Sequence, residues 1–182
     1  ILENSIDAIL SEMQQLKGRV DVAEIRLDYL EPSAWDRLAL LKEKAPLPLL
    51  FTFRKEEQGG HLAIPEKKRL GLYEEALSLL PAFADIEVDT DPAFIERIKT
   101  MYPQISLIGS FHDFEKTPYD LASLLQSMHA ARFSMVKIAV KARSTLDLMR
   151  LMAFAKEMAP KYPLSCIAIG EYGQPSRVLG PI

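Results

Sequence analysis

Short apolar segments alternate with helical patterns along the whole chain. Between the apolar segments, hydrophobic residues recur at every third or fourth position, as on one face of an α-helix. The apolar segments are rich in β-branched and aromatic residues and are short enough for strands. There are six of them, at residues 22–29, 47–54, 83–89, 105–114, 135–140 and 164–172. Strict alternation of strand and helix with short loops predicts a parallel sheet covered by helices.

Local signals mark where several of these helices begin and end. A residue with a side-chain oxygen, followed by proline at the first helical position, is a common helix start. We predict helix starts at Ser33, Pro65, Asp91-Pro92, Thr117-Pro118 and Ser144. Gly18 and Pro81 indicate helix ends, because glycine is favoured just after a helix and proline cannot continue one.

Polar residues occupy alternate positions in the second half of nearly every predicted strand. Residues two apart in a strand point to the same face of the sheet. The sets are Glu24, Arg26 and Asp28; Thr52 and Arg54; Asp85, Glu87 and Asp89; Ser110 and His112; and Lys137 and Lys141. An open parallel sheet has two apolar faces, and no glycine-rich nucleotide-binding motif follows any strand here. The pattern therefore favours one α/β domain over residues 1–182, of the TIM (β/α)8 barrel type, with its active site where the strands end.

Lys137 stands in the middle of the apolar run at residues 135–140. Burial of an unpaired ammonium group is costly, so burial favours the neutral amine and lowers the pKa of a lysine. A neutral amine is a nucleophile that can form an imine with a ketone. The alternative is that Lys137 points outward from a half-exposed strand and only adds solubility.

Composition argues against several classes of protein. The chain has 182 residues, 48% of them hydrophobic, and a formal net charge of −3, whereas a nucleic-acid-binding protein usually presents a basic face. No apolar run approaches the roughly 18 residues of a membrane span, and no secretory signal is visible. Cys166 is the single cysteine and cannot form an internal disulfide, so we expect a reducing compartment such as the cytoplasm. No cluster of metal ligands stands out.

Six short motifs follow one another along the predicted strands. They are EIRLD at 24–28, FTFR at 51–54 with GG at 59–60, DIE at 85–87, SFHDF at 110–114 with TP at 117–118, VKIA at 136–139, and SR at 176–177. In order and spacing they resemble the type I 3-dehydroquinate dehydratases of the shikimate pathway, including those fused to shikimate dehydrogenase. The resemblance covers about residues 20–180.

The resemblance implies a lyase that removes water from 3-dehydroquinate to give 3-dehydroshikimate. Lys137 is similar to the residue that forms the imine, and His112 to the general acid and base. Arg177 is similar to the arginine that holds the substrate carboxylate. Glu24, Arg26 and Arg54 would contact substrate hydroxyls and shape the field of the pocket. The family needs no metal or organic cofactor, and a homodimer or a fused dehydrogenase domain would be compatible with it.

The chain departs from the family pattern at two points. Gln58 stands where the family commonly has a glutamate that orients the catalytic histidine. The family barrel has eight βα units, whereas we count six strands, with no counterpart of the first and the eighth. Because the chain begins at Ile1, we expect that it begins inside a longer product.

Two other functions remain open at this point. A class I aldolase would also use a strand lysine to form an imine, with a phosphate or small keto-acid site beside it. The missing strands and Gln58 would also be compatible with an inactive fragment or paralogue that serves as a folding or interaction module.

Overall fold

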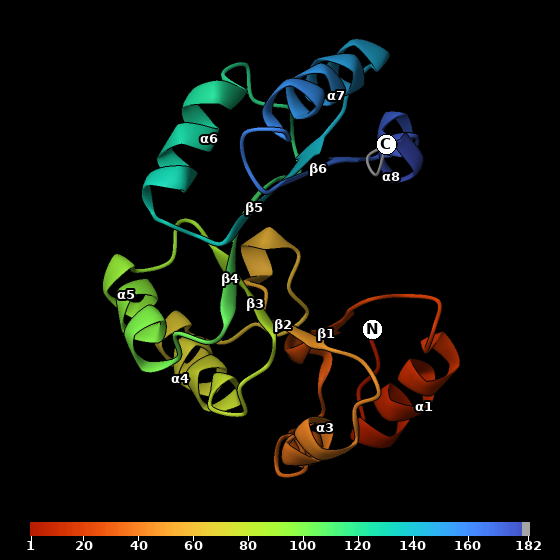
Figure 1. The fold of residues 1–182 in the computed structure, drawn as a ribbon, viewed down its shortest axis with the longest axis vertical. Helices are drawn as coiled ribbons and strands as arrows, with labels where there is room; N and C mark the ends of the chain where they lie inside the picture. The colour runs from red at the N-terminus through yellow and green to blue at the C-terminus, as the bar shows by residue number, and fades with distance from the viewer. Residues whose placement is uncertain (180–182) are drawn as a thin grey trace. The chain divides into compact units, whose positions relative to one another are not determined.

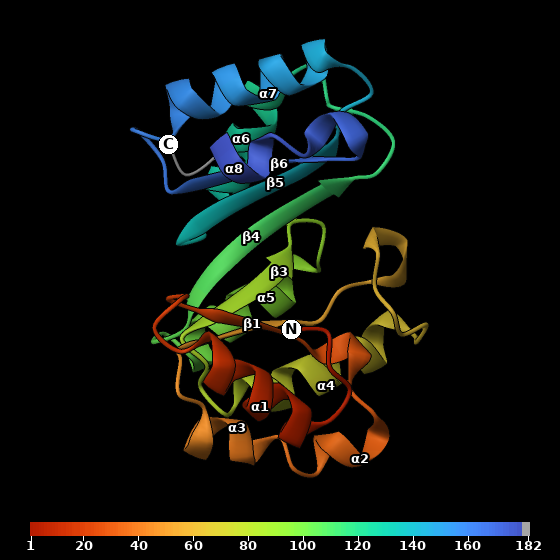
Figure 2. The same cartoon turned by 90° about the vertical axis from the view of Figure 1, so that its right-hand side faces the viewer.

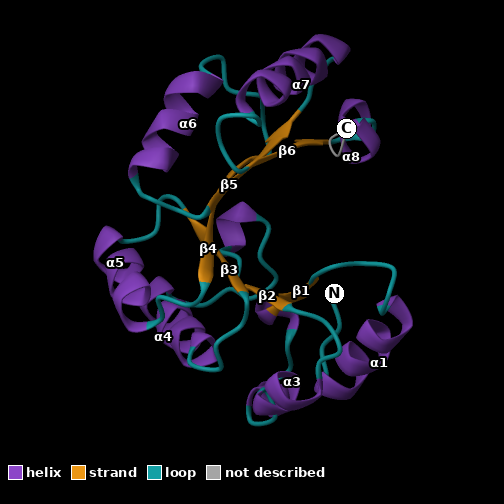
Figure 3. Ribbon diagram, viewed as in Figure 1, coloured by secondary structure: helices purple, strands orange, loops and turns teal. Residues whose placement is uncertain are grey.

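The computed structural model of the protein describes residues 1–179, which form two compact units that meet in sequence between Ser106 and Leu107. Figure 1 shows the course of the chain, and Figure 3 its helices and strands. The first unit contains α1 (Ile6–Leu16), β1 (Ala23–Arg26), α2 (Pro32–Trp35), α3 (Ala39–Lys44), β2 (Leu49–Thr52), α4 (Glu66–Leu77), β3 (Phe83–Glu87) and α5 (Pro92–Met101). The second contains β4 (Ser106–Asp113), α6 (Leu121–Ala130), β5 (Met135–Lys141), α7 (Thr145–Met158), β6 (Leu164–Ile169) and α8 (Ser176–Leu179). All six predicted strands are confirmed.

In the first unit, β1, β2 and β3 pair in parallel and in sequence order. Alternation buries Ala23 and Ile25 of β1 and leaves Glu24 and Arg26 half-buried on the other face. Helices α1, α3 and α4 lie on one side of the strands (Figure 2). The apolar face of α1, with Ile6, Ile9 and Met13 buried, therefore belongs to the core on that side.

In the second unit, β4, β5 and β6 also pair in parallel and in sequence order. Cys166 and Ala168 of β6 are buried, whereas Ser165 and Ile167 are half-buried on the opposite face. Helices α6 and α7 lie on the same side of β5 and β6 (Figures 1 and 2). Each unit thus has one face covered by helices and one face that carries the polar strand positions.

Several predicted helix signals are confirmed. Asp91 accepts a hydrogen bond from the backbone N–H of Ala93 at 2.9 Å, and Ser144 accepts one from Asp147 at 3.2 Å. These side chains satisfy donors that the first helical turn leaves without a partner. Gly18 follows α1 with φ +78°, the left-handed backbone that glycine adopts without steric cost.

The predicted cap at Thr117 is wrong. Thr117 is buried, and its hydroxyl donates to the carbonyl oxygen of Lys141 at 3.0 Å. The next helix, α6, begins at Leu121, and the carboxylate of Asp120 caps it by accepting from Ser123 N at 2.9 Å. A tertiary contact to the end of β5 thus replaces the local role of Thr117.

Two other predicted helix boundaries are also wrong. The stretch after Ser33 is not one helix, because a turn at residues 36–38 separates α2, which already begins at Pro32, from α3. Pro65 precedes α4 as predicted, but the helix stops at Leu77 rather than at Pro81. Leu80 has φ +61° and lies outside the helix.

Candidate active site

In the first unit, the polar residues of β1 and β2 form a connected set. Arg26 is in register with Thr52, and the Thr52 hydroxyl donates to Glu24 Oε1 at 2.6 Å. Neighbouring strands in a sheet are about 4.8 Å apart, so registered residues share a face. The structure therefore brings the predicted residues Glu24 and Arg26 together on the face opposite the helices.

Arg26 is held in one orientation by several contacts. Its Nε and Nη2 donate to the two carboxylate oxygens of Asp28 at 2.8 and 2.6 Å, and Nη2 also donates to the Gly59 carbonyl at 3.0 Å. The guanidinium lies 5.1 Å from the ring centre of Tyr29. Partial burial acts to lower the pKa of Arg26, but the Asp28 carboxylate outweighs this and the pKa is raised. The arginine is therefore a fixed, permanent cation.

Arg54 is more buried than the sequence indicates. Its side chain is 4% exposed and pairs with Asp85 at 2.9 Å and with Glu87 at 3.3 Å, both on β3. The Lys55 backbone N–H also donates to Glu87 Oε1 at 3.1 Å. The carboxylates of the DIE motif thus neutralise and orient the Arg54 guanidinium.

Gln58 lies in a short 3-10 turn after β2, at Glu56–Gln58. Its side-chain amide donates to Asp89 Oδ1 at 3.2 Å, and the Lys55 ammonium binds the same oxygen at 2.8 Å. Both side chains line an open pocket of about 390 Å³. An orienting effect of Gln58 on His112 stays a prediction.

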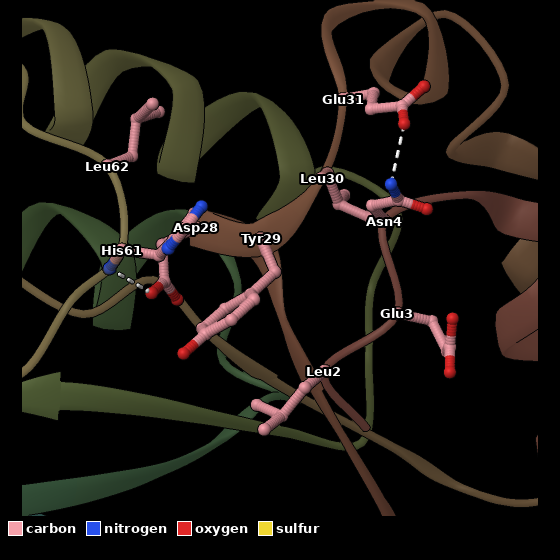
Figure 4. Close-up of a pocket in the computed structure, with 9 residues that line it drawn as sticks. All are labelled: Leu2, Glu3, Asn4, Asp28, Tyr29, Leu30, Glu31, His61 and Leu62. Carbon is pink, nitrogen blue, oxygen red and sulfur yellow. Dashed lines mark hydrogen bonds between the residues drawn. The ribbon is translucent and has the colours of Figure 1, made fainter.

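Tyr29 and His61 line a second pocket, and neither belongs to the six sequence motifs. His61 stacks on Tyr29 with ring centres 4.6 Å apart, and its backbone N–H donates to Asp28 Oδ2 at 2.8 Å. Figure 4 shows these side chains beside Leu2, Asn4 and Glu31 in an open pocket of about 480 Å³. The imidazole itself is exposed, as expected for a loop histidine.

The loop after β2 turns back on itself at Gly60, and we expect Gly60→Ala to destabilise the protein. A Cβ here would lie 2.7 Å from the Lys55 carbonyl group and closer still to the Arg54 carbonyl oxygen, both fixed backbone. Overpacking of this kind costs about 1–3 kcal/mol. Gly71→Ala is the matched control, since its Cβ would meet nothing within 4 Å on α4 and should stabilise the helix. Urea unfolding of both variants tests this, and equal stability of Gly60→Ala and the parent would contradict it.

In the second unit, Lys137 occupies the middle of β5. Its register partners are Ser110 on β4 and Ser165 on β6, so three polar side chains form one row across the strands. Lys137 is half-buried, with buried Val136 and Ile138 on either side of it in the strand. This arrangement indicates that the Lys137 side chain lies on the polar face of the sheet and is partly shielded from solvent.

His112 follows Ser110 by two residues on β4 and therefore lies on the same face, one step further along than Lys137. Its ring stacks against Phe114 with centres 6.1 Å apart and planes inclined by 11°. The carboxylate of Asp113 accepts from the backbone N–H groups of Glu115 and Lys116, both at 2.9 Å. Asp113 therefore shapes the turn after the strand.

Arg177 lies on the short helix α8, where it is exposed. The preceding residue, Ser176, is buried and fixes this helix to β6. Its hydroxyl donates to the Gly173 carbonyl at 2.7 Å and accepts from Ala168 N at 3.0 Å. The helix backbone is thus anchored, whereas the guanidinium remains accessible.

Two polar residues of α4, Arg69 and Tyr73, are buried, and the sequence assigned no role to either. The Tyr73 hydroxyl lies 2.8 Å from the carbonyl oxygens of Phe51 and Asp85. Burial raises the pKa of Tyr73 well above its usual value, so the phenol is neutral. Arg69 stands one helical turn before Tyr73, and this i, i+4 spacing was the available signal.

Cys166 is a buried thiol on the helix-covered face of β6, and burial raises its pKa to about 12. At pH 8 only about one thiol in 10⁴ would then be ionised, against about a quarter for an ordinary cysteine. We expect a disulfide reagent to label the native protein at least about 100-fold more slowly than the urea-unfolded protein. Complete labelling of the native protein at the unfolded rate would contradict this.

Residues 1–179 contain no group of three or more His, Cys, Asp or Glu side chains placed to hold a metal ion. Within the same residues, no helix is both long and apolar enough to span a membrane.

Comparison with known proteins places this chain in a family. The sequence model of the family described as type I 3-dehydroquinase matches residues 1–182. The chain is 31% identical over 169 residues to the 3-dehydroquinate dehydratase of Thermococcus onnurineus, covering 91% of this chain and 75% of that protein. It is 29% identical over 184 residues to the bifunctional 3-dehydroquinate dehydratase/shikimate dehydrogenase of Arabidopsis thaliana, covering 98% of this chain and 30% of that protein.

A solved structure agrees with these relatives. The type I 3-dehydroquinate dehydratase of Clostridium difficile, with covalently modified comenic acid, superposes with a TM-score of 0.89 at 27% identity. The match covers 100% of this chain and 78% of that one. The predicted fold class is confirmed by this similarity and by the six parallel strands among residues 1–179.

Proposed function

Because this chain belongs to the type I 3-dehydroquinase family, we propose that it removes water from 3-dehydroquinate through an imine formed on Lys137. The observation that carries the proposal is the pair Lys137 and His112 on the same face of neighbouring strands. An amine nucleophile and an imidazole one step apart are the two groups that the reaction requires. The structure of the Clostridium difficile relative holds covalently modified comenic acid, which supports covalent chemistry in this family.

The chemistry proceeds in balanced steps. The neutral Lys137 amine attacks the substrate ketone, and the resulting carbinolamine loses water to give the imine. His112 then takes the proton from the carbon next to the imine, and the electron pair moves into an enamine. The enamine expels the neighbouring hydroxyl, to which His112 returns its proton, so that water leaves. Hydrolysis of the product imine consumes one water, releases 3-dehydroshikimate and restores Lys137.

The basic residues would bind and orient the substrate. Arg177 is accessible, and a guanidinium fork matches the geometry of the substrate carboxylate. Arg26 is a fixed cation with Glu24 beside it on β1, suited to substrate hydroxyls. Arg54 is held by two carboxylates. It would act mainly by contributing its positive charge to the electrostatic field at the substrate.

Borohydride trapping tests the proposed reaction. With 3-dehydroquinate, we expect a stable reduced adduct on Lys137, located by peptide mass spectrometry, together with steady turnover. An adduct that forms only with pyruvate or a triose phosphate would favour a class I aldolase. Absence of turnover and of every adduct would favour the inactive interaction module. The presence of a strand lysine does not distinguish these three functions. The compound that is trapped on the lysine does.

Gln58→Glu restores the glutamate that the family commonly has at this position, and it tests whether residue 58 acts on His112. In the family pattern a glutamate at this position orients the catalytic histidine, and a carboxylate in contact with an imidazole stabilises the cationic form and raises the pKa. We expect the acid limb of the kcat/KM profile to move up by about 1 pH unit, because His112 must be neutral to act as the base. Gln14→Glu, at an exposed position of α1, is the control and should leave the profile unchanged. Identical profiles for the parent and Gln58→Glu would remove Gln58 from the site.

The proposal also covers the partner domain, the oligomeric state, the domain organisation and the location of the protein. The Arabidopsis relative is a bifunctional protein, which supports a fused shikimate dehydrogenase domain as one possible partner. A homodimer and a single dehydratase domain over residues 1–182 stay predictions, as does a reducing, cytoplasmic location. Size-exclusion chromatography with light scattering tests the first of these.

A further inference from the structure

Arg69 is buried against the end of β2, although it belongs to helix α4. Its side chain is 2% exposed, and all three guanidinium nitrogens have acceptors. Nε and Nη2 donate to the two carboxylate oxygens of Glu66 at 2.7 and 2.8 Å, and Nη1 donates to the carbonyl oxygen of Phe53. Phe53 directly precedes Arg54, so Arg69 fixes the backbone from which Arg54 projects.

Arg69 also belongs to a chain of alternating charges that includes Arg54 and ends at Asp85. In order, the five groups are Glu66, Arg69, Glu87, Arg54 and Asp85, joined at 2.7, 3.3, 3.3 and 2.9 Å. Glu87 is the central member, with Oε2 facing Arg69 and Oε1 facing both Arg54 and Lys55 N. Each oxygen of this buried carboxylate is thereby committed to a different neighbour.

The charges explain why Arg69 matters for Arg54. Burial acts to lower the pKa of Arg69, but Glu66 and Glu87 outweigh it and the pKa is raised, so the cation persists at every pH of interest. Glu87 Oε2 is buried and makes no hydrogen bond among the described residues, so the Arg69 charge is what holds it. Without the Arg69 charge, both carboxylate oxygens of Glu87 would turn to Arg54. The Arg54 guanidinium would then be less available to a substrate.

We propose that Arg69 is a positioning residue, which sets the orientation and the available charge of Arg54 through Glu87. The inference rests on the proposed function, in which Arg54 contributes to substrate binding. Helix docking alone does not require this arrangement, because well-packed apolar residues serve that purpose at least as well as buried ion pairs. Tyr73, one turn along α4, completes the same face by reaching the Phe51 and Asp85 carbonyls.

The test is a comparison of KM and kcat in four variants of the whole chain. We expect Arg69→Met to raise the KM for 3-dehydroquinate by about 10-fold or more, with kcat within about threefold of the parent. Arg69→Lys keeps the charge but loses the fork, and should recover part of the loss. Arg97→Met is the matched control. Arg97 of α5 pairs at the surface with Glu74 of α4, the helix that carries Arg69, and its loss should leave KM unchanged.

A fourth variant keeps the test decisive if Arg69→Met folds poorly. Arg69→Met/Glu87→Gln removes both partners and leaves no unpaired buried charge. Action through Glu87 predicts that this double variant has a KM no higher than that of Arg69→Met. If the parent turns over but KM is unchanged in the folded Arg69 variants, Arg69 is only structural and the inference is overturned. If the parent neither turns over nor forms an adduct, the proposed function fails and this inference fails with it.

Discussion

Lys137→Ala is expected to reduce kcat by at least about 10⁴-fold, because the imine route has no other nucleophile to begin it. A loss of this size corresponds to about 5.5 kcal/mol of transition-state stabilisation. The substrate would still bind through the arginines, so the binding constant from calorimetry should change by less than about tenfold. The reduced borohydride adduct should disappear completely.

Lys141→Ala is the matched control for this variant. Lys141 lies at the end of the same strand, four residues further on and on the same face, but it is exposed. We expect it to retain turnover within about threefold and to form the adduct at the parent rate. If Lys137→Ala still formed an adduct and Lys141→Ala did not, the nucleophile would be Lys141 and the proposed geometry would be wrong.

The strands and their polar faces were predictable because they follow from local pattern. A period of two along β1 separates Glu24 and Arg26 from Ala23 and Ile25, and the structure buries the latter pair. The rows across strands were less predictable. That Lys137 pairs with Ser110 and Ser165 depends on register, which tertiary packing sets and the sequence does not state.

The positions that the sequence failed to predict are those where a distant segment competes with a local signal. Thr117 followed by proline is a good helix start, yet the Lys141 carbonyl takes its hydroxyl. Arg69 has the polarity of a surface residue, yet the Phe53 carbonyl and Glu87 draw it into the interior. In both cases the partner is more than 15 residues away, beyond the reach of any helical or strand period.

Arg54 illustrates the same limit at the site itself. Its place at the end of β2 indicated a substrate contact, but the two acidic residues that bury it lie on β3. Their motif was visible in the sequence, and the pairing was not. A charged residue beside a predicted active site can therefore be a ligand contact or part of its supporting network, and only the fold separates the two.

His112→Ala is expected to separate the covalent step from proton transfer. General acid–base catalysis by a positioned imidazole contributes between about 10² and 10⁴ in rate, so kcat should fall within that range. The imine on Lys137 should still form, because its nucleophile is intact. We therefore expect borohydride to trap an adduct of substrate rather than of dehydrated product, which mass spectrometry distinguishes by one water.

His61→Ala serves as the control, since its exposed imidazole stacks on Tyr29 in the pocket of Figure 4 and has no assigned part in the reaction. It should retain parent turnover within about threefold. A His112→Ala variant that traps only dehydrated product at the parent rate would show that another group moves the proton. Because Lys137→Ala loses the adduct and His112→Ala keeps it, the two variants together assign the nucleophile and the base independently, which neither could do alone.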